Sequence, residues 1–409
     1  MPLFSYKVKM PSGSTNEGVM TAADESSAIA RLKSQRATVI EISQVKTSIL
    51  ETLQNLNPLK PGIKAKDIVI FSRQLSTLVS AGVPLVQGLT VLIEQIESPR
   101  FKLIVKDIRE SIQAGVSIAD SMKTHPSAFS ELYVSMIKAG EVGGILDVIL
   151  ERVSEYLEKA EELKSKVVGA MVYPAVIAVV AFGVVIFLLT FVIPRFAEIF
   201  TSFGSELPWP TRILLGSSNF VKSYIIFIIL GIIGLIIGFI QFYKSTFGKY
   251  KVDDIMLKLP VFGVLLKKVA VSKFTRTLST LVKSGIPILE ALDTVAQTSG
   301  NKVIEEAIIK AKDAVREGSK ISDPLKESKL FPPMVVQMIA VGEETGNLDT
   351  MLGKIADFYD QEVDASVKAL TSMIEPLVIV VMGLVVGFIV IAMFMPMFSM
   401  GGLAAGAGG

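Results

Sequence analysis

The sequence predicts a mainly α-helical integral membrane protein. It has three transmembrane helices, two homologous cytoplasmic helical bundles of about six helices each, and a small N-terminal α/β subdomain. Three observations lead to this fold class: long uncharged runs in the middle and at the end of the 409 residues, a set of motifs that occurs twice, and an alternating pattern at the start. The chain is 50% hydrophobic, with a mean hydropathy of +0.54, which is high for a soluble protein.

The α/β subdomain is expected over residues 1–45. Leu3–Lys9 alternates between apolar and polar residues as a strand does, Asp24–Lys33 has a short helical pattern, and Val39–Val45 is expected to form a second strand. A linker rich in turn-forming residues is expected over 46–65. No long apolar stretch opens the sequence, so we expect no cleavable signal peptide.

Two copies of one helical unit are expected to form the bundles. Phe71–Leu85 reappears as Phe274–Ile288, 203 residues later, and Ala139–Asp147 reappears as Val341–Asp349, 202 residues later. The match continues into the uncharged runs, so the repeating unit is a bundle together with its exit helix. Two widely separated copies indicate a duplication and not a solenoid.

Three uncharged runs are long enough to cross a bilayer as helices. Lys and Arg concentrate on one side of these runs, which predicts that both bundles lie in the cytoplasm and that the C-terminus lies outside. After the linker we therefore expect a first cytoplasmic module over 66–166, transmembrane helix 1 over 167–193, a periplasmic loop over 194–222, transmembrane helix 2 over 223–243, a second cytoplasmic module over 244–375, transmembrane helix 3 over 376–398 and a periplasmic tail over 399–409.

Gly, Pro and Asp residues at repeated positions are expected to end and begin the helices of each module. A glycine followed two residues later by proline suits the left-handed position just after a helix, and Asp suits the N-cap position. We expect turn glycines at Gly82, Gly285, Gly140 and Gly342, and helix N-caps at Asp120 and Asp323.

Glu141 and Glu343 are the two residues most open to a functional interpretation. Each follows a glycine within the repeated motif. A carboxylate at a helix N-terminus is stabilised by the helix dipole by a few tenths to about 1 kcal/mol, and this structural role is one interpretation. The alternative is a contact with a cation or a partner at a module interface, and the pattern assigns no metal ligands.

Small residues in the expected spans suit close helix packing, because they let backbones approach each other. The candidate packing residues are Gly234, Gly238, Gly383 and Gly387. Pro174, one turn inside the first span, is expected to kink it, and Pro376 is expected to start the third span.

The sequence contains no recognisable machinery for chemistry, so we expect neither enzymatic activity nor a cofactor. It lacks a phosphate-binding loop, has no Cys, and has one His, His125, without a counterpart in the second copy. No basic patch with interleaved aromatic residues predicts binding to nucleic acid. The spans carry no charged residue, which argues against a transporter. A static membrane anchor remains an alternative.

Together these features resemble the PilC/GspF family, the inner-membrane platform of type IV pili and type II secretion. The resemblance rests on the Phe4–Tyr6 opening, both Leu-x-x-Leu-Val-x-x-Gly-x-Pro segments, both Gly-Glu-x-x-Gly-x-Leu-Asp motifs and the three spans. It implies a bacterial inner-membrane protein that contacts membrane lipid, an assembly or retraction ATPase, pilins and other assembly components, as a homo-oligomer. A pilus platform is preferred, with a secretion or competence platform as the alternative. The junctions Leu163–Tyr173 and Ala365–Glu375 are the expected points of transmission.

Overall fold

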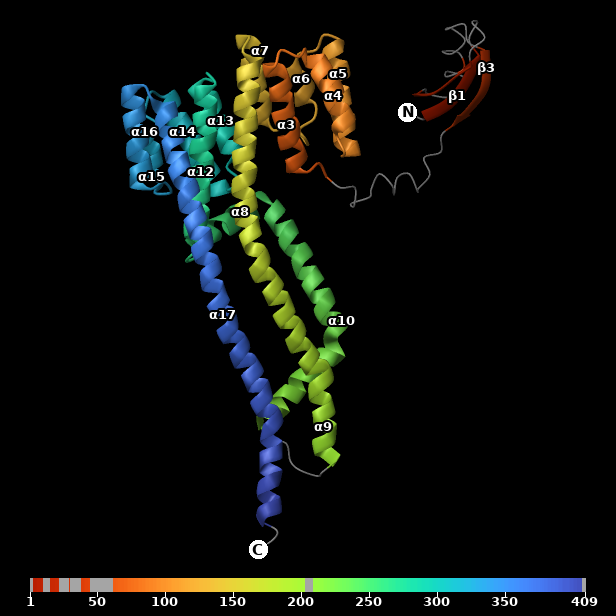
Figure 1. The fold of residues 1–409 in the computed structure, drawn as a ribbon, viewed down its shortest axis with the longest axis vertical. Coiled ribbons are helices and arrows are strands. Elements are labelled where there is room, and N and C mark those ends of the chain that lie inside the picture. Colours follow the sequence, from red (N-terminus) through yellow and green to blue (C-terminus); the bar gives the residue numbers. More distant parts are fainter. Residues whose placement is uncertain are drawn as a thin grey trace. The chain divides into compact units, whose positions relative to one another are not determined.

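The structure is a computed structural model that describes residues 3–9, 15–21, 29, 38–44, 62–202 and 209–406 (Figure 1). The chain divides into two compact units, one ending at Gly62 and the other beginning at Ile63. The first unit holds the N-terminal strands, and the second holds both helical modules and the long apolar helices.

The N-terminal unit contains a three-stranded antiparallel sheet in the order β2-β1-β3. Strand β1 spans Leu3–Lys9, β2 spans Thr15–Thr21 and β3 spans Thr38–Gln44. β1 was predicted with these bounds, and β3 lies one residue earlier than expected. β2 was missed, because its sequence is mostly polar and only its pairing along β1 makes it a strand. The expected helix Asp24–Lys33 lies outside the described residues, apart from Ile29.

Each module of the second unit contains the same succession of six helices within the described residues (Figure 1). The first module comprises α3 (Ala65–Ser80), α4 (Leu85–Gln95), α5 (Pro99–Gln113), α6 (Ile118–Lys123), α7 (Glu131–Gly143) and α8 (Leu146–Phe187). The second comprises α12 (Phe262–Lys283), α13 (Ile288–Thr298), α14 (Lys302–Arg316), α15 (Ser322–Ser328), α16 (Pro333–Thr345) and α17 (Leu348–Gly406).

The helix boundaries repeat at the spacing that the sequence predicts. α4 and α5 recur as α13 and α14 after 203 residues, and α7 recurs as α16 after 202. The helix count and order expected from duplication are therefore confirmed. One further helix, α11 (Thr246–Lys258), precedes α12 and is not part of the repeated set.

Equivalent buried side chains form the core of each module. In the first, the ring of Phe71 lies edge-on to that of Phe101, with centroids 5.3 Å apart, and 6.1 Å from that of Phe129. In the second, Phe274 and Phe331, which correspond to Phe71 and Phe129, lie 4.9 Å apart. All five rings are almost fully buried, so the same apolar stripe holds both bundles together.

Three helical segments have the length and apolar composition of membrane spans: Leu146–Phe196, Trp209–Lys244 and Leu348–Met395. The first combines α8, a π-helical turn η1 (Leu188–Val192) and the start of α9 (Ile193–Ser202), and the second is α10. The last helix of each module thus runs on, without a break, into a span.

One expectation about the spans needs correction. The segment 194–222, expected as a loop, is helical on both sides of residues 203–208, because α9 ends at Ser202 and α10 begins at Trp209. Pro376 lies inside α17, which runs unbroken from the module into the span, and its place as the start of the span stays a prediction. Its missing N–H is tolerated there, as it is in other membrane helices with an internal proline. Pro174 lies inside α8, as expected.

At the end of the spans that lies away from the modules, α9, α10 and α17 approach one another (Figure 1). Ile193, Leu214, Ile389 and Ala392 are buried there against one another. Thr211 Oγ1 donates a hydrogen bond to the Ala392 carbonyl at 2.5 Å, which links α10 to α17. Most other apolar side chains of the spans are exposed, so lipid or other protein must cover them.

Candidate functional site

The two glutamates of the repeated motif cap helices inside their own modules. The carboxylate of Glu141, near the end of α7, accepts hydrogen bonds from the backbone N–H groups of Ile118 and Ala119 at 3.0 and 3.3 Å. Both groups belong to the first turn of α6, whose N–H groups lack partners within the helix. The negative charge of Glu141 therefore lies at the N-terminus of α6, the helix that precedes α7 in the chain.

Glu343 makes the equivalent contacts in the second module. Its carboxylate accepts from the N–H groups of Ile321 and Ser322 at 2.5 and 3.1 Å, at the start of α15. Each glutamate thus ties the fifth helix of its module to the fourth. In each glutamate, both carboxylate oxygens accept hydrogen bonds from backbone N–H groups. This is the structural role, one of the two interpretations that the sequence suggested. The described residues contain no group of three side chains suited to hold a metal ion.

The glycines of the repeat serve two different purposes. Gly82 and Gly285 have positive φ angles of 81° and 79°, and lie just after α3 and α12 as expected. Gly140 and Gly342 are not turn glycines, because both lie inside helices. A Cβ at Gly140 would lie 2.9 Å from the Ile149 side chain, and a Cβ at Gly342 would lie 3.0 Å from the backbone of the next helix. They allow close helix approach.

The turn role belongs instead to Gly144 and Gly346, which end α7 and α16 in the left-handed conformation. The N-cap prediction also needs correction. Ser117 caps α6 by accepting from the Asp120 N–H at 3.1 Å, so Asp120 lies in the first turn. Asp323 likewise lies inside the first turn of α15, where Glu343 satisfies the free N–H groups.

An arginine in the first helix of each module holds the exit helix of that module. Arg73 in α3 donates from Nε and Nη2 to the two carboxylate oxygens of Glu158 in α8, at 2.6 and 2.5 Å. Arg276 in α12 donates to Asp357 at 2.8 Å and to Asp360 in α17. Arg276 and Asp360 are the repeat equivalents of Arg73 and Glu158. We call the two pairs the arginine clamps.

The clamp of the first module shifts the pKa values of both of its partners. The hydrogen bond from Arg73 lowers the pKa of Glu158 below its ordinary value, against the opposing effect of partial burial. The same bond raises the pKa of Arg73. Glu158 is therefore fully ionised near neutral pH, and the clamp keeps both charges.

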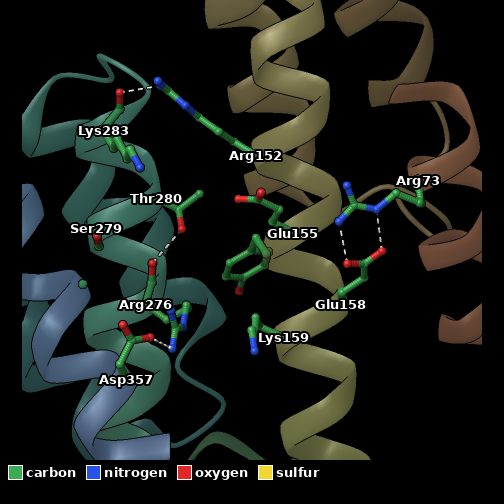
Figure 2. A pocket seen from close by; sticks show the side chains of 12 residues that line it. Arg73, Arg152, Glu155, Glu158, Lys159, Arg276, Ser279, Thr280, Lys283 and Asp357 are labelled. Atoms are coloured by element: carbon green, nitrogen blue, oxygen red, sulfur yellow. Dashed lines mark hydrogen bonds and ion pairs between the residues drawn. The ribbon is translucent and has the colours of Figure 1, made fainter. Parts of the chain in front are cut away.

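A charged cleft of about 500 Å³ lies between the two modules, bordered by both clamps (Figure 2). Figure 2 shows the side chains of α8 facing those of α12 across it, with Arg73 and Glu158 at the α3 side and Arg276 and Asp357 at the α17 side. It is lined by Arg73, Arg152, Glu155, Tyr156, Glu158, Lys159, Arg276, Ser279, Thr280, Lys283, Gly353 and Asp357. We call this space the inter-module cleft.

Polar side-chain contacts link α8 to the second module around this cleft. Arg152 Nη1 donates to the Lys283 carbonyl at 2.5 Å, the Tyr156 hydroxyl lies 3.2 Å from that of Thr277, and Lys166 Nζ lies 2.7 Å from an Asp364 carboxylate oxygen. Lys283 is the last residue of α12, so Arg152 brings positive charge to the negative end of that helix. Each module is thus tied to its own exit helix by a clamp, and α8 also contacts the second module beside the charged cleft.

The inter-module cleft is strongly charged. The cleft has no His, and its acids are paired with or surrounded by guanidinium and ammonium groups.

In the spans, a Cβ at Gly234, Gly238, Gly383 or Gly387 would meet no atom of the described residues within 4 Å. These four glycines therefore do not mediate contacts between helices within the described part of the chain.

The sequence reasoning missed the clamps and the cleft. A signal for the clamps was present, because Arg73 and Arg276 are the third residues of the quoted repeat. Their partners Glu158 and Asp360 are both acidic and lie 202 residues apart, which is the spacing of the later part of the repeat. The contacts across the cleft join residues more than a hundred positions apart and follow no repeat, so no sequence pattern indicated them.

Comparison with protein families finds two matching family models. The model described as "Type II secretion system (T2SS), protein F" matches twice, over residues 71–194 and 274–396. The model described as "Type II secretion system protein F, N-terminal domain" matches residues 1–43. The two matches of the first model begin 203 residues apart and end 202 apart, which are the spacings of the repeat.

Curated relatives match along almost the whole chain. The type IV pilus assembly protein PilC of Myxococcus xanthus is 46% identical over 399 residues, which cover 98% of this chain and 95% of the relative. PilC of Thermus thermophilus is 41% identical, covering 97% of this chain and 98% of the relative. The type II secretion system protein F of Vibrio cholerae is 34% identical, covering 98% and 99%.

Proposed function

Because the chain belongs to the type II secretion system protein F family, we propose that it is the inner-membrane platform of a type IV pilus machine. In this role it couples a cytoplasmic assembly and retraction ATPase to the insertion of pilins and the growth of the filament. The pilus assignment is favoured by the identities of 46% and 41% to two pilus assembly proteins, against 34% to a secretion protein.

The observation that carries this proposal is the continuity of α8 and α17. α8 is 42 residues long, which corresponds to about 63 Å, roughly twice the thickness of the hydrocarbon core. Half of the helix therefore belongs to the module and half to the membrane. A continuous helix transmits a rotation or tilt of the module to the span, with no flexible joint between them.

The arginine clamps and the inter-module cleft support the same role. Each clamp makes the exit helix part of its module. A change in the angle between the modules would open or close the cleft and would break polar contacts beside it, such as Arg152 to Lys283 and Lys166 to Asp364. A partner that moves one module relative to the other would move α8 relative to α17 within the membrane. The transmission points in this account are the stretches Leu163–Tyr173 and Ala365–Glu375.

The modules face the cytoplasm in this proposal, and the link between α9 and α10 lies outside. Lys and Arg near the span ends favour this orientation. Reporter fusions at residue 204 and at Lys249 should then give opposite signals. Glycines 234, 238, 383 and 387 are open within the described chain, and we propose that they contact further copies of the chain or other membrane components.

The energy for movement comes from the partner ATPase. The sequence has no phosphate-binding loop, so the chain itself is proposed to lack nucleotide hydrolysis. A secretion platform remains the second candidate, because the Vibrio cholerae relative matches over the full length. Both candidates use the same mechanics and differ in the filament that is assembled.

The proposal is tested in a strain whose gene for this chain is deleted. The strain should lack surface pili, and the full chain should restore them. The purified protein should bind the assembly ATPase and should show no ATP hydrolysis without it. Normal piliation in the deletion strain together with lost protein secretion would favour the second candidate, and unchanged piliation and secretion would contradict both.

A further inference from the structure

α11 follows a membrane span so closely that it must lie at the membrane surface. α10 ends at Lys244 and α11 begins at Thr246, so one residue, Ser245, separates them. One residue moves the chain by about 3.8 Å, which is too little to carry α11 away from the end of the span. In Figure 1 the chain passes from the end of α10 to the base of α12, where α17 leaves the second module.

The direction of α11 is set by tight backbone packing. The Ser245 hydroxyl accepts a hydrogen bond from the Gly248 N–H at 3.0 Å and so caps the helix. A Cβ at Gly248 would lie 1.9 Å from the Phe242 carbonyl oxygen, so only glycine permits this turn. The span and α11 are therefore joined by a rigid corner.

A buried carboxylate fastens α11 to both of its neighbours. Asp253 is 3% exposed, and it accepts from the Tyr243 hydroxyl at 3.1 Å and from the Lys302 N–H at 2.7 Å. Tyr243 is in the last turn of α10, and Lys302 begins α14. One face of α11 is thereby turned towards the module, and the opposite face is left outside.

That outer face and the turn after it are apolar and uncovered. Phe247 and Ile255 lie eight residues apart, and Leu259, just after the helix, follows four residues later, so the three lie on one side of α11. A tight turn at Val261 follows, in which the Phe262 N–H bonds to the Pro260 carbonyl at 2.8 Å. Val261 has a φ of 67° there, which is unfavourable for a β-branched residue. The exposed apolar side chains are Phe247, Ile255, Met256, Leu259, Val261 and Phe262. We call them the α11 surface.

Positive charge surrounds the α11 surface. Lys251 lies over the Phe247 ring, 5.8 Å from its centroid, and Lys244, Lys249 and Lys258 lie nearby in the chain. Of the acidic residues in α11, Asp253 is committed to internal hydrogen bonds, and Asp254 pairs with Lys258. An apolar face with a basic border is the pattern of helices that lie in the interface of a membrane containing anionic lipid.

We propose that the α11 surface is seated in the interface of the lipid bilayer, with its lysines on anionic phospholipid headgroups. It is continuous with span two, which is already in the membrane. The second module is therefore held at a fixed height and tilt on the membrane by three attachments: span two, α11 and α17. α11 precedes the duplicated unit, so this seat belongs to the second module and is not part of the repeat.

The absence of Cys from the sequence makes this proposal directly measurable. Single variants Phe247→Cys and Ile255→Cys, each carrying a nitroxide spin label, are placed in vesicles of phosphatidylcholine with or without phosphatidylglycerol. Leu103→Cys is the matched control, because Leu103 is an exposed apolar residue of α5 in the first module. Accessibility to oxygen and to a water-soluble nickel chelate is measured for each label by electron paramagnetic resonance.

Labels at 247 and 255 should be reached by oxygen much more than by the nickel chelate, and the label at 103 should show the reverse. Phosphatidylglycerol should increase the depth at 255, and the double substitution Lys249→Gln, Lys251→Gln should remove that increase. Nickel access at 247 and 255 equal to that at 103 would overturn the proposal. Protection from both reagents would also overturn it and would indicate contact with a second protein copy. Equal depth in both lipids would contradict the assignment to anionic headgroups.

Discussion

Replacement of Glu141 by alanine should loosen the start of α6 and leave the second module unchanged. The substitution removes both acceptors of the Ile118 and Ala119 N–H groups, which are held at 3.0 and 3.3 Å. Glu141 itself is exposed, so the loss should resemble that of a helix N-cap, about 1 kcal/mol, which is about a five-fold change in local opening. Alanine keeps the helical propensity of α7 high, so α7 should not be affected.

Hydrogen exchange followed by mass spectrometry measures this loss on the intact protein. Exchange in the peptide containing Ile118 and Ala119 should become about five-fold faster. The peptide containing Ile321 and Ser322 is the internal control, because Glu343 caps it in the same way. Glu343→Ala should give the reverse pattern. Unchanged exchange at 118–119, or an equal rise at both helix starts, would refute the capping role.

Three further substitutions or conditions test other contacts. Gly140→Ala should lower the melting temperature, since its Cβ would lie 2.9 Å from Ile149 and overpacking costs about 1–3 kcal/mol, while Gly169→Ala, with open space around it, should not. Asp253→Ala should destabilise the purified protein by about 1–3 kcal/mol, because two half-buried donors lose their buried acceptor, and thermal unfolding would show this. The pKa of Glu158 is lowered, so the stabilisation by its clamp is complete above the ordinary glutamate pKa and is lost as the pH falls through the lower folded value. Arg73→Gln should remove that acid-dependent part of the unfolding curve, and an unchanged curve would contradict it.

Local patterns predicted the helices well because the two copies repeat the same stops. Gly82 with Pro84, and Gly285 with Pro287, end α3 and α12 where expected, since a left-handed glycine before a proline leaves the helix no continuation. The strand β2 was missed because its polar residues form a strand only through pairing with β1. Propensity alone does not contain that information.

The details of the candidate site depended on contacts that sequence spacing does not reveal. Gly140 looked like a turn residue, whereas its function is to let Ile149 approach. Asp120 looked like a cap, but Ser117, three residues earlier, takes that position. The inter-module cleft joins α8 to α12, and which faces of these helices meet follows from packing of the whole unit.

Each module is proposed to be rigidly coupled to the membrane through an unbroken exit helix. A short flexible Gly/Ser insertion at Ser165 interrupts α8 between the module and the span, and leaves the clamp at Glu158 in place. The matched control is the same insertion after Gly115, in the turn between α5 and α6, where no exit helix is interrupted.

Surface pili are the measurement, made in a strain that expresses each variant in place of the normal chain. Both variants should reach the normal level in the membrane and bind the ATPase, which shows that the modules are folded. The insertion at Ser165 should then abolish filament growth, whereas the insertion after Gly115 should preserve it. Normal filaments from the Ser165 variant would contradict rigid coupling through α8 and would favour a static membrane anchor.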